Sequence, residues 1–101
     1  MNKYLLIINP VSGNKTGSII ADKIKKKLST HNFVVDCLTT EYKGHATEYL
    51  YNINKDTYQS IIAIGGDGTY HEIINGILKR TDDYNPVLGF IPGGTGNSLM
   101  H

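Results

Sequence analysis

The sequence predicts an α/β fold, a three-layer αβα arrangement in which helices cover both faces of a mainly parallel sheet. Two observations lead to this prediction. Short apolar runs alternate with segments in which apolar residues recur every three or four positions, which is the pattern of alternating strands and helices. Three of the apolar runs also end in a loop that contains glycine. The 101 residues are enough for one such domain.

Four apolar runs are the expected strands. Lys3–Ile8 is almost entirely apolar, as in a parallel strand that is buried on both faces. Residues 33–39 are rich in β-branched and apolar side chains, and residues 59–64 and 87–91 form two further runs. Strands that are joined by helices pair in parallel through right-handed crossovers. All four strands should therefore end at the same edge of the sheet.

Helices are expected between the strands. Apolar residues recur at four-residue steps from residue 20 to residue 28, which predicts an amphipathic helix. Gly44 leads into a second helix, and Thr69 with Glu72 is expected to form a capping box at the start of a third. A last helix should begin at residue 97 or 98. The predicted inner faces are Ala46, Tyr49, Leu50 and Ile53 in the second helix and Ile73, Ile74, Ile77 and Leu78 in the third.

Composition narrows the classes of partner. Ten basic and nine acidic residues give a net charge of +1, so the chain has no general field for nucleic acid, and no such partner is predicted. Cys37 is the single cysteine; it excludes an intramolecular disulfide, agrees with a reducing cytosol and is expected to be buried. The first apolar run is too short for a signal peptide or a membrane span, so a soluble, cytoplasmic protein is expected. The lysines between residues 23 and 27 indicate a solvated helix face.

The glycine-bearing loops indicate one ligand site. In open α/β sheets, ligands bind at the carboxyl edge of the strands, so residues 9–17, 65–69 and 92–97 are expected to surround one cleft. Glycine lets backbone N–H groups approach a phosphate closely, and a helix that begins after the loop adds its positive end. The Thr69 hydroxyl and Lys15 are further candidate contacts. For any single loop, a simple tight turn remains the alternative.

Asp67 stands out among these glycines. A carboxylate repels a phosphate unless it acts through a metal ion or takes a proton from an attacking hydroxyl, and both roles belong to phosphoryl transfer. The chain has neither the P-loop pattern nor the dinucleotide fingerprint, and it has no cysteine and histidine cluster for zinc and no nucleophile elbow. No metal ligands are assigned from the sequence, and hydrolase functions are disfavoured.

Four segments, in order, resemble one family. Residues 9–13 are similar to its opening nucleotide loop, residues 40–46 to its segment that ends in Gly-His-Ala, and residues 92–97 to the loop that closes over the nucleotide. Residues 65–76 resemble its signature, in which Gly-Gly-Asp-Gly-Thr is followed by Glu and then by Asn-Gly. The chain is thereby identified as a member of the diacylglycerol kinase catalytic domain superfamily, which includes sphingosine, ceramide and bacterial lipid kinases.

The resemblance implies ATP and Mg²⁺ as cofactors and Asp67 as the catalytic residue, with the role of a base acting on a lipid hydroxyl. It implies that the nucleotide-binding residues are Asn9, Ser12, Gly13, Thr40, Gly65, Gly66, Asp67, Gly68, Thr69, Tyr70, His71, Glu72, Gly94, Thr95, Gly96 and Asn97. It also implies a lipid substrate at a membrane surface, with peripheral membrane association during catalysis. A homodimer is left open.

The resemblance leaves the lipid undecided, because His71 and Asn97 are closer to the sphingosine and ceramide branch and Thr69 to the diacylglycerol branch. Family members carry a second, mainly β lobe that the 101 residues do not contain, so we expect no turnover from this chain alone. Two other functions stay open. One is a soluble-substrate kinase of the NAD kinase type, and the other is a non-catalytic nucleotide-binding module.

Overall fold

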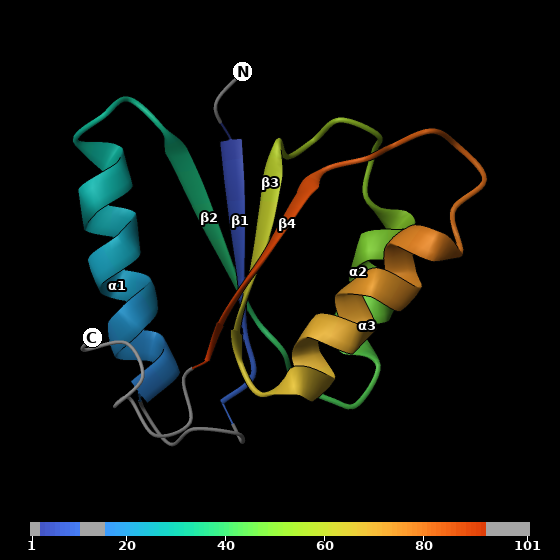
Figure 1. Ribbon diagram of the computed structural model, residues 1–101, viewed down its shortest axis with the longest axis horizontal. Helices are drawn as coiled ribbons and strands as arrows, with labels where there is room; N and C mark the ends of the chain where they lie inside the picture. Colours follow the sequence, from blue (N-terminus) through green and yellow to red (C-terminus); the bar gives the residue numbers. More distant parts are fainter. Residues whose placement is uncertain (1–2, 11–15, 93–101) are drawn as a thin grey trace.

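In the computed structural model, which describes residues 3–10 and 16–92, four strands alternate with three helices (Figure 1). The predicted alternation is confirmed, and each strand begins and ends within one residue of its predicted bounds. The helix expected at residue 97 or 98 lies outside the described residues. The elements are β1 (Lys3–Ile8), α1 (Thr16–Ser29), β2 (Val34–Thr39), α2 (His45–Asn52), β3 (Ser60–Gly65), α3 (Asp67–Leu78) and β4 (Val87–Pro92).

The strands form one parallel sheet in the order β2-β1-β3-β4. The chain runs outward from β1 to β2 and then crosses back to β3 on the other side of β1. The strand order therefore reverses between β1 and β3, where Ile8 pairs with Ile64 at the carboxyl end. The crevice outside such a switch point is the usual ligand position in open α/β sheets.

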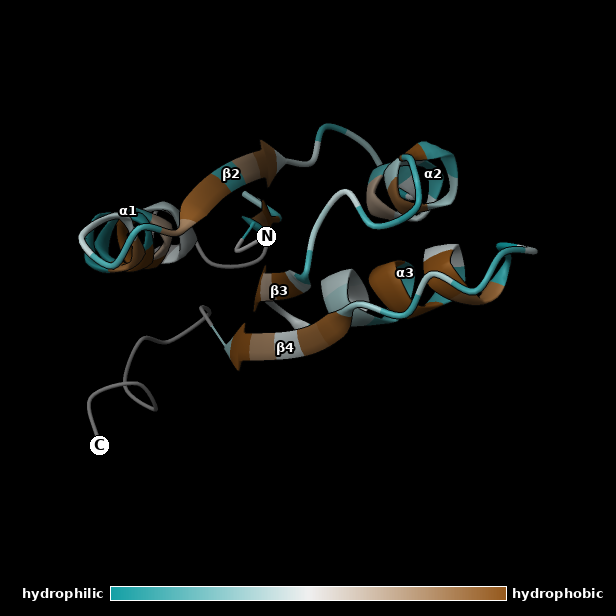
Figure 2. Ribbon diagram, turned by 90° about the horizontal axis from the view of Figure 1, so that it is seen from above, coloured by the Kyte–Doolittle hydropathy of each residue, from teal (hydrophilic) through white to brown (hydrophobic). Residues whose placement is uncertain are grey.

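The helices cover the two faces of the sheet, α1 on one face and α2 with α3 on the other (Figures 1 and 2). Alternate residues of β1 enter the two resulting cores. Leu5 and Ile7 pack in the cluster with α2 and α3, whereas Leu6 and Ile8 pack in the cluster with α1. All four are at most 4% exposed, so β1 is buried on both faces, as its apolar run predicts. The three-layer prediction is confirmed.

Three expectations about single residues are wrong. Thr69 and Glu72 form no capping box, because α3 begins at Asp67 with Gly66 as its N-cap, and the Glu72 carboxylate binds backbone amides at the start of α2 instead. Leu78 is 74% exposed, because it is the last residue of α3 and lies past the inner row. Cys37 is exposed rather than buried, because β2 is an edge strand of the sheet.

Candidate functional site

A pocket of about 550 Å³ lies at the carboxyl edge of the sheet, beside the switch point. Three segments that are distant in the sequence build it: the end of β1, the loop after β2 and the first turns of α3. The N-termini of all three helices lie at this edge, the lower one in Figure 1. The lining residues are Asn9, Pro10, Thr40, Glu41, Tyr42, Lys43, Thr69 and Glu72.

Four predicted site residues therefore come together in this pocket: Asn9, Thr40, Thr69 and Glu72. The other four lining residues, Pro10 and residues 41–43, were not among the individually predicted site residues, although Pro10 lies in the first loop expected at the cleft. Their position could have revealed them, because each directly follows a strand at the carboxyl edge, where loops of parallel sheets carry ligands. The single-residue predictions instead followed the glycine motifs.

The turn from β3 to α3 forms one side of the site. Gly65 has φ of +139°, a conformation that side chains other than glycine rarely adopt, and Gly66 then turns the chain into the helix. No side chain caps the start of α3, although the Thr69 amide donates to the Gly66 carbonyl at 3.3 Å. Asp67 and Gly68, in the first turn, are exposed. The uncapped amides and the positive end of α3 suit an anion.

Residues 40–44, which we call the 40–44 wall, form the opposite side. At its first end, the Thr40 amide and hydroxyl both donate to the Ile8 carbonyl, at 2.9 and 3.3 Å. These bonds tie the end of β2 to the end of β1. At its other end, Gly44 has φ of +91° and is the N-cap of α2. The wall is therefore attached at both ends, while its central residues 41–43 are exposed.

An aromatic pair connects this wall with the start of α2. The Tyr42 ring stacks on the His45 ring, with centroids 4.5 Å apart and planes 9° apart. The Tyr42 hydroxyl donates to Glu48, and this hydrogen bond raises the pKa of the Tyr42 phenol. His45 accepts the Glu41 amide through Nδ1 at 3.0 Å. His45 is the first residue of α2, and Tyr42 remains 54% exposed.

Other predicted residues lie elsewhere on α3 or outside the described part of the chain. The Tyr70 ring packs toward β4, 5.6 Å from the Phe90 ring, and does not line the pocket. His71 is exposed and is also absent from the lining. Gly65, Gly66, Asp67 and Gly68 form the turn described above. Lys15, Ser12, Gly13, Gly94, Thr95, Gly96 and Asn97 lie outside the described residues.

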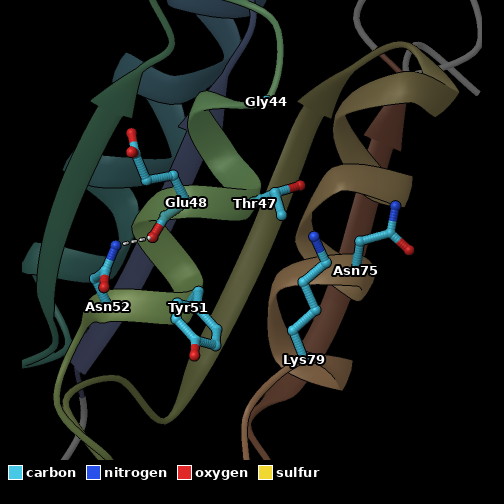
Figure 3. A pocket seen from close by; sticks show the side chains of 7 residues that line it. All are labelled: Gly44, Thr47, Glu48, Tyr51, Asn52, Asn75 and Lys79. Carbon is cyan, nitrogen blue, oxygen red and sulfur yellow. Dashed lines mark hydrogen bonds between the residues drawn. The ribbon is translucent and has the colours of Figure 1, made fainter.

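A larger pocket of about 820 Å³ lies between α2 and α3 (Figure 3). Its lining is a mixture of polar and charged side chains, including Glu48, Asn75 and Lys79, with Tyr51 as the aromatic member. It contains neither a glycine turn after a strand nor the start of α3. We therefore place the functional site in the smaller pocket, where the sheet edge, the turn and the helix start converge.

The described residues contain no group of three or more His, Cys, Asp or Glu side chains arranged to hold a metal ion. Asp67 is the carboxylate that the first turn of α3 contributes. Mg²⁺ is often bound by one or two carboxylates together with substrate phosphates, so this arrangement suits a metal that arrives with a nucleotide. Among residues 3–10 and 16–92, none of the helices combines the length and apolar content that a membrane span needs.

Comparison with known proteins decides the family. The diacylglycerol kinase catalytic domain matches residues 3–101. The chain belongs to this family. The resemblance noted from the sequence motifs is thereby confirmed.

Solved and curated proteins agree with the family. A crystal structure of a diacylglycerol kinase from Bacillus anthracis superposes with a TM-score of 0.73 at 36% identity, covering 95% of this chain and 34% of that one. Sphingosine kinase 1 of Arabidopsis thaliana is 30% identical over 97% of this chain and 21% of its own. Mouse ceramide kinase is 38% identical over 78% and 15%. The chain thus spans between 15% and 34% of the length of these proteins.

Proposed function

We propose that this chain is the nucleotide-binding part of an ATP-dependent lipid kinase, which transfers the γ-phosphoryl group of ATP to a lipid hydroxyl. The observation that carries the proposal is the pocket at the switch point, bounded on one side by the uncapped start of α3. Family membership supports the reaction class. The proposal extends to the whole protein, of which such a chain would form one part.

The phosphates would bind at the start of α3. Gly68 carries no side chain, and a Cβ added there would meet nothing within 4 Å, so this surface is open to a ligand. Backbone amides and the helix dipole supply positive partial charge without a lysine in the P-loop position. Mg²⁺ that arrives with the nucleotide would neutralise further phosphate charge. Asn9 and Thr40 would contact the nucleotide from the facing segments.

Asp67 is the proposed catalytic residue. As the lipid oxygen forms its bond to the γ-phosphorus, the bond from that phosphorus to the β,γ-bridging oxygen breaks and ADP leaves. The hydroxyl proton passes to the Asp67 carboxylate. Asp67 is exposed at the first residue of α3, so an acceptor can reach it. General base catalysis of this kind contributes typically a factor of about 10² to 10⁴.

The proposed substrate class is a lipid alcohol at a membrane surface. The relatives are named as kinases of sphingosine, ceramide and diacylglycerol, which share a hydroxyl on an apolar molecule. We also propose that the protein is cytoplasmic and associates with the membrane during catalysis. A non-catalytic nucleotide module and an NAD kinase type of enzyme are the competing functions that the experiments must separate.

The first experiment is a titration of the isotopically labelled chain with Mg-ATP, followed by amide chemical shifts. Shifts concentrated at residues 40–44 and 65–69 are expected. A flat titration of a folded sample at millimolar Mg-ATP would contradict nucleotide binding by this chain. Gly68→Ala should weaken binding, because its methyl group lies where the phosphates approach the start of α3.

The second experiment tests the reaction in the full-length protein. Asp67→Asn should retain Mg-ATP binding within a few-fold and lower lipid phosphorylation by at least roughly 100-fold. Asp22→Asn changes an exposed aspartate on α1 and is the control for the loss of one charge. Equal lipid kinase rates in Asp67→Asn and wild type would exclude Asp67 as the base. Activity toward NAD in place of lipids would favour the competing enzyme class.

A further inference from the structure

Glu72 belongs to α3, but its carboxylate stabilises a different helix. Its Oε2 accepts the Gly44 amide at 3.1 Å, and its Oε1 accepts the Ala46 amide at 3.2 Å. Gly44 is the N-cap of α2 and has no side chain with which to cap it. The first amides of a helix need acceptors, and a negative charge near them interacts favourably with the helix dipole. Glu72 therefore caps α2 from across the helix pair.

Two further contacts hold the same helices together. The Thr47 hydroxyl donates to the Glu72 carbonyl at 2.8 Å. Gly76 lies so close to α2 that an added Cβ would be 2.7 Å from the Thr47 carbonyl oxygen. The start of α2 is thus held against the first turns of α3 by a side chain, a hydroxyl and a close backbone contact. Of these three, only the Glu72 carboxylate reaches Gly44, the end of the 40–44 wall.

The 40–44 wall and the start of α3 offer different chemistry to a ligand. The start of α3 offers amides and the helix dipole, which suit phosphate groups. The wall offers the Tyr42 ring, which is 54% exposed and stacked on His45. An aromatic ring that is fixed on one face can accept a planar base on the other. The pocket therefore divides into a phosphate side on α3 and a nucleoside side on the wall.

We infer that Glu72 is a positioning residue that holds the 40–44 wall against the nucleoside part of the ligand. This inference rests on the proposed nucleotide function. The carboxylate lines the pocket, yet its two oxygens accept amides of α2, where the helix dipole offsets its charge. Glutamate suits both tasks, because it supplies two acceptor oxygens, whereas glutamine would turn an NH₂ group toward one of the amides.

The test compares Glu72→Gln and Glu72→Ala with Thr47→Val in the 101-residue chain. Thr47→Val removes the other polar link between the same helices and leaves the cap in place. The ligands are Mg-ATP and magnesium tripolyphosphate, which has the phosphates but no nucleoside. Urea unfolding gives the stability of each variant, and hydrogen exchange reports protection of the Gly44 and Ala46 amides.

The Glu72 variants should bind Mg-ATP roughly tenfold more weakly, whereas their affinity for tripolyphosphate should change less than about twofold. Their Gly44 and Ala46 amides should also exchange faster. Thr47→Val should keep the wild-type affinity for both ligands. A variant that is merely less rigid would lose affinity for both ligands in parallel, and this result would overturn the inference.

Two other outcomes separate the inference from the function on which it rests. Wild-type Mg-ATP affinity in Glu72→Gln, with fast exchange at Gly44 and Ala46, would overturn the positioning role and leave the nucleotide site intact. A folded wild-type chain that binds neither ligand would overturn the proposed function, and the inference with it.

Discussion

Gly68 and Gly76 lie on the same helix, α3, and have opposite surroundings. A Cβ added at Gly68 would meet nothing within 4 Å. A Cβ added at Gly76 would lie 2.7 Å from the Thr47 carbonyl oxygen and 2.9 Å from the Leu50 Cβ. The first glycine leaves room for a ligand, and the second allows two helices to approach closely. The same substitution at the two positions should therefore have different effects.

Gly76→Ala should destabilise the fold by about 1–3 kcal/mol, because the overpacked methyl group pushes α2 away from α3. Gly68→Ala should leave stability unchanged or raise it by up to about 1 kcal/mol, since alanine favours the helical conformation. Urea unfolding of both variants measures the difference. Equal midpoints for the two variants would show that α2 and α3 do not meet at Gly76.

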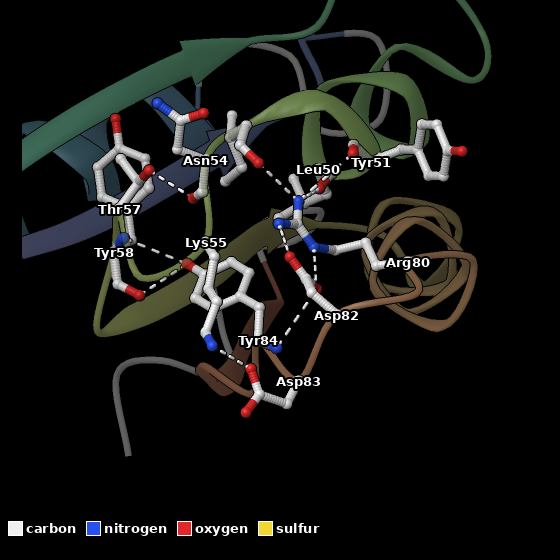
Figure 4. A network of polar contacts seen from close by, with 11 residues as sticks. Leu50, Tyr51, Asn54, Lys55, Thr57, Tyr58, Arg80, Asp82, Asp83 and Tyr84 are labelled. Carbon is white, nitrogen blue, oxygen red and sulfur yellow. Dashed lines mark hydrogen bonds and ion pairs between the residues drawn. The ribbon is translucent and has the colours of Figure 1, made fainter.

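At the scale of elements, α2 depends on side chains from outside itself at both ends. It has eight residues, and a helix this short is not stable alone in water. Glu72 binds amides at its start. At its other end, Arg80 Nη1 donates to the carbonyls of Leu50 at 2.8 Å and Ile53 at 2.7 Å (Figure 4). Both ends of α2 are therefore fixed by α3 and the residues that follow it.

Arg80→Met should destabilise the fold by about 1.5–3 kcal/mol, the range for hydrogen bonds to a charged group. The Arg80 side chain is 6% exposed, and Asp82 accepts from its Nε and Nη2 at 3.0 and 2.6 Å, so the change also leaves Asp82 without this partner. Lys79→Met, at the exposed neighbouring residue, is the matched control and should stay within about 0.5 kcal/mol of wild type. Similar losses of unfolding free energy in both variants would show that the hydrogen bonds of Arg80 do not stabilise the fold.

The pairing of Arg80 with Asp82 also predicts that the stability of the fold depends on pH in the acid range. The hydrogen bond from Arg80 lowers the pKa of Asp82 below its ordinary value of 3.8. The unfolded chain therefore takes up this proton first as the pH falls. The contribution of Asp82 is complete above about pH 3.8 and is lost as the pH falls through its lowered pKa.

Urea unfolding between pH 2 and pH 5 should show this loss in wild type, and Asp82→Asn should flatten the pH profile. Asp56→Asn, at an exposed residue of the loop between α2 and β3, is the control for the change in net charge. A wild-type profile that is retained in Asp82→Asn would mean that Arg80 and Asp82 do not form this pair in solution.

At the scale of the whole molecule, the sequence predicts the order of the layers better than it predicts which side chains contact each other between elements. The apolar period of each strand and helix is local, so Lys3–Ile8 could be placed as a strand buried on both faces. The carboxyl edge follows from that order, and with it the convergence of Asn9, Thr40 and Thr69. The amide partners of Glu72 could not be predicted, because the choice between its own helix and α2 depends on how closely α2 and α3 pack.

The size of the chain relative to its relatives leads to the last prediction. The chain spans 21% of Arabidopsis sphingosine kinase 1 and 34% of the Bacillus anthracis structure, so most of each relative lies outside the matched region. Phosphoryl transfer needs positioning of the acceptor as well as neutralisation of phosphate charge. The described residues offer the start of α3 for the second task and Asp67 as the proposed proton acceptor, and they contain no cluster of three or more metal-binding side chains.

The pure 101-residue chain should therefore bind Mg-ATP and produce no lipid phosphate. Transfer of labelled phosphate to diacylglycerol, sphingosine and ceramide in mixed micelles measures this directly, with the full-length protein as the positive control and its Asp67→Asn variant as the blank. Lipid phosphorylation by the short chain above that blank would show that the acceptor site is contained in these residues. If only the full-length protein is active, acceptor binding lies in the remaining part, because the proposed phosphate side of the pocket is formed by α3.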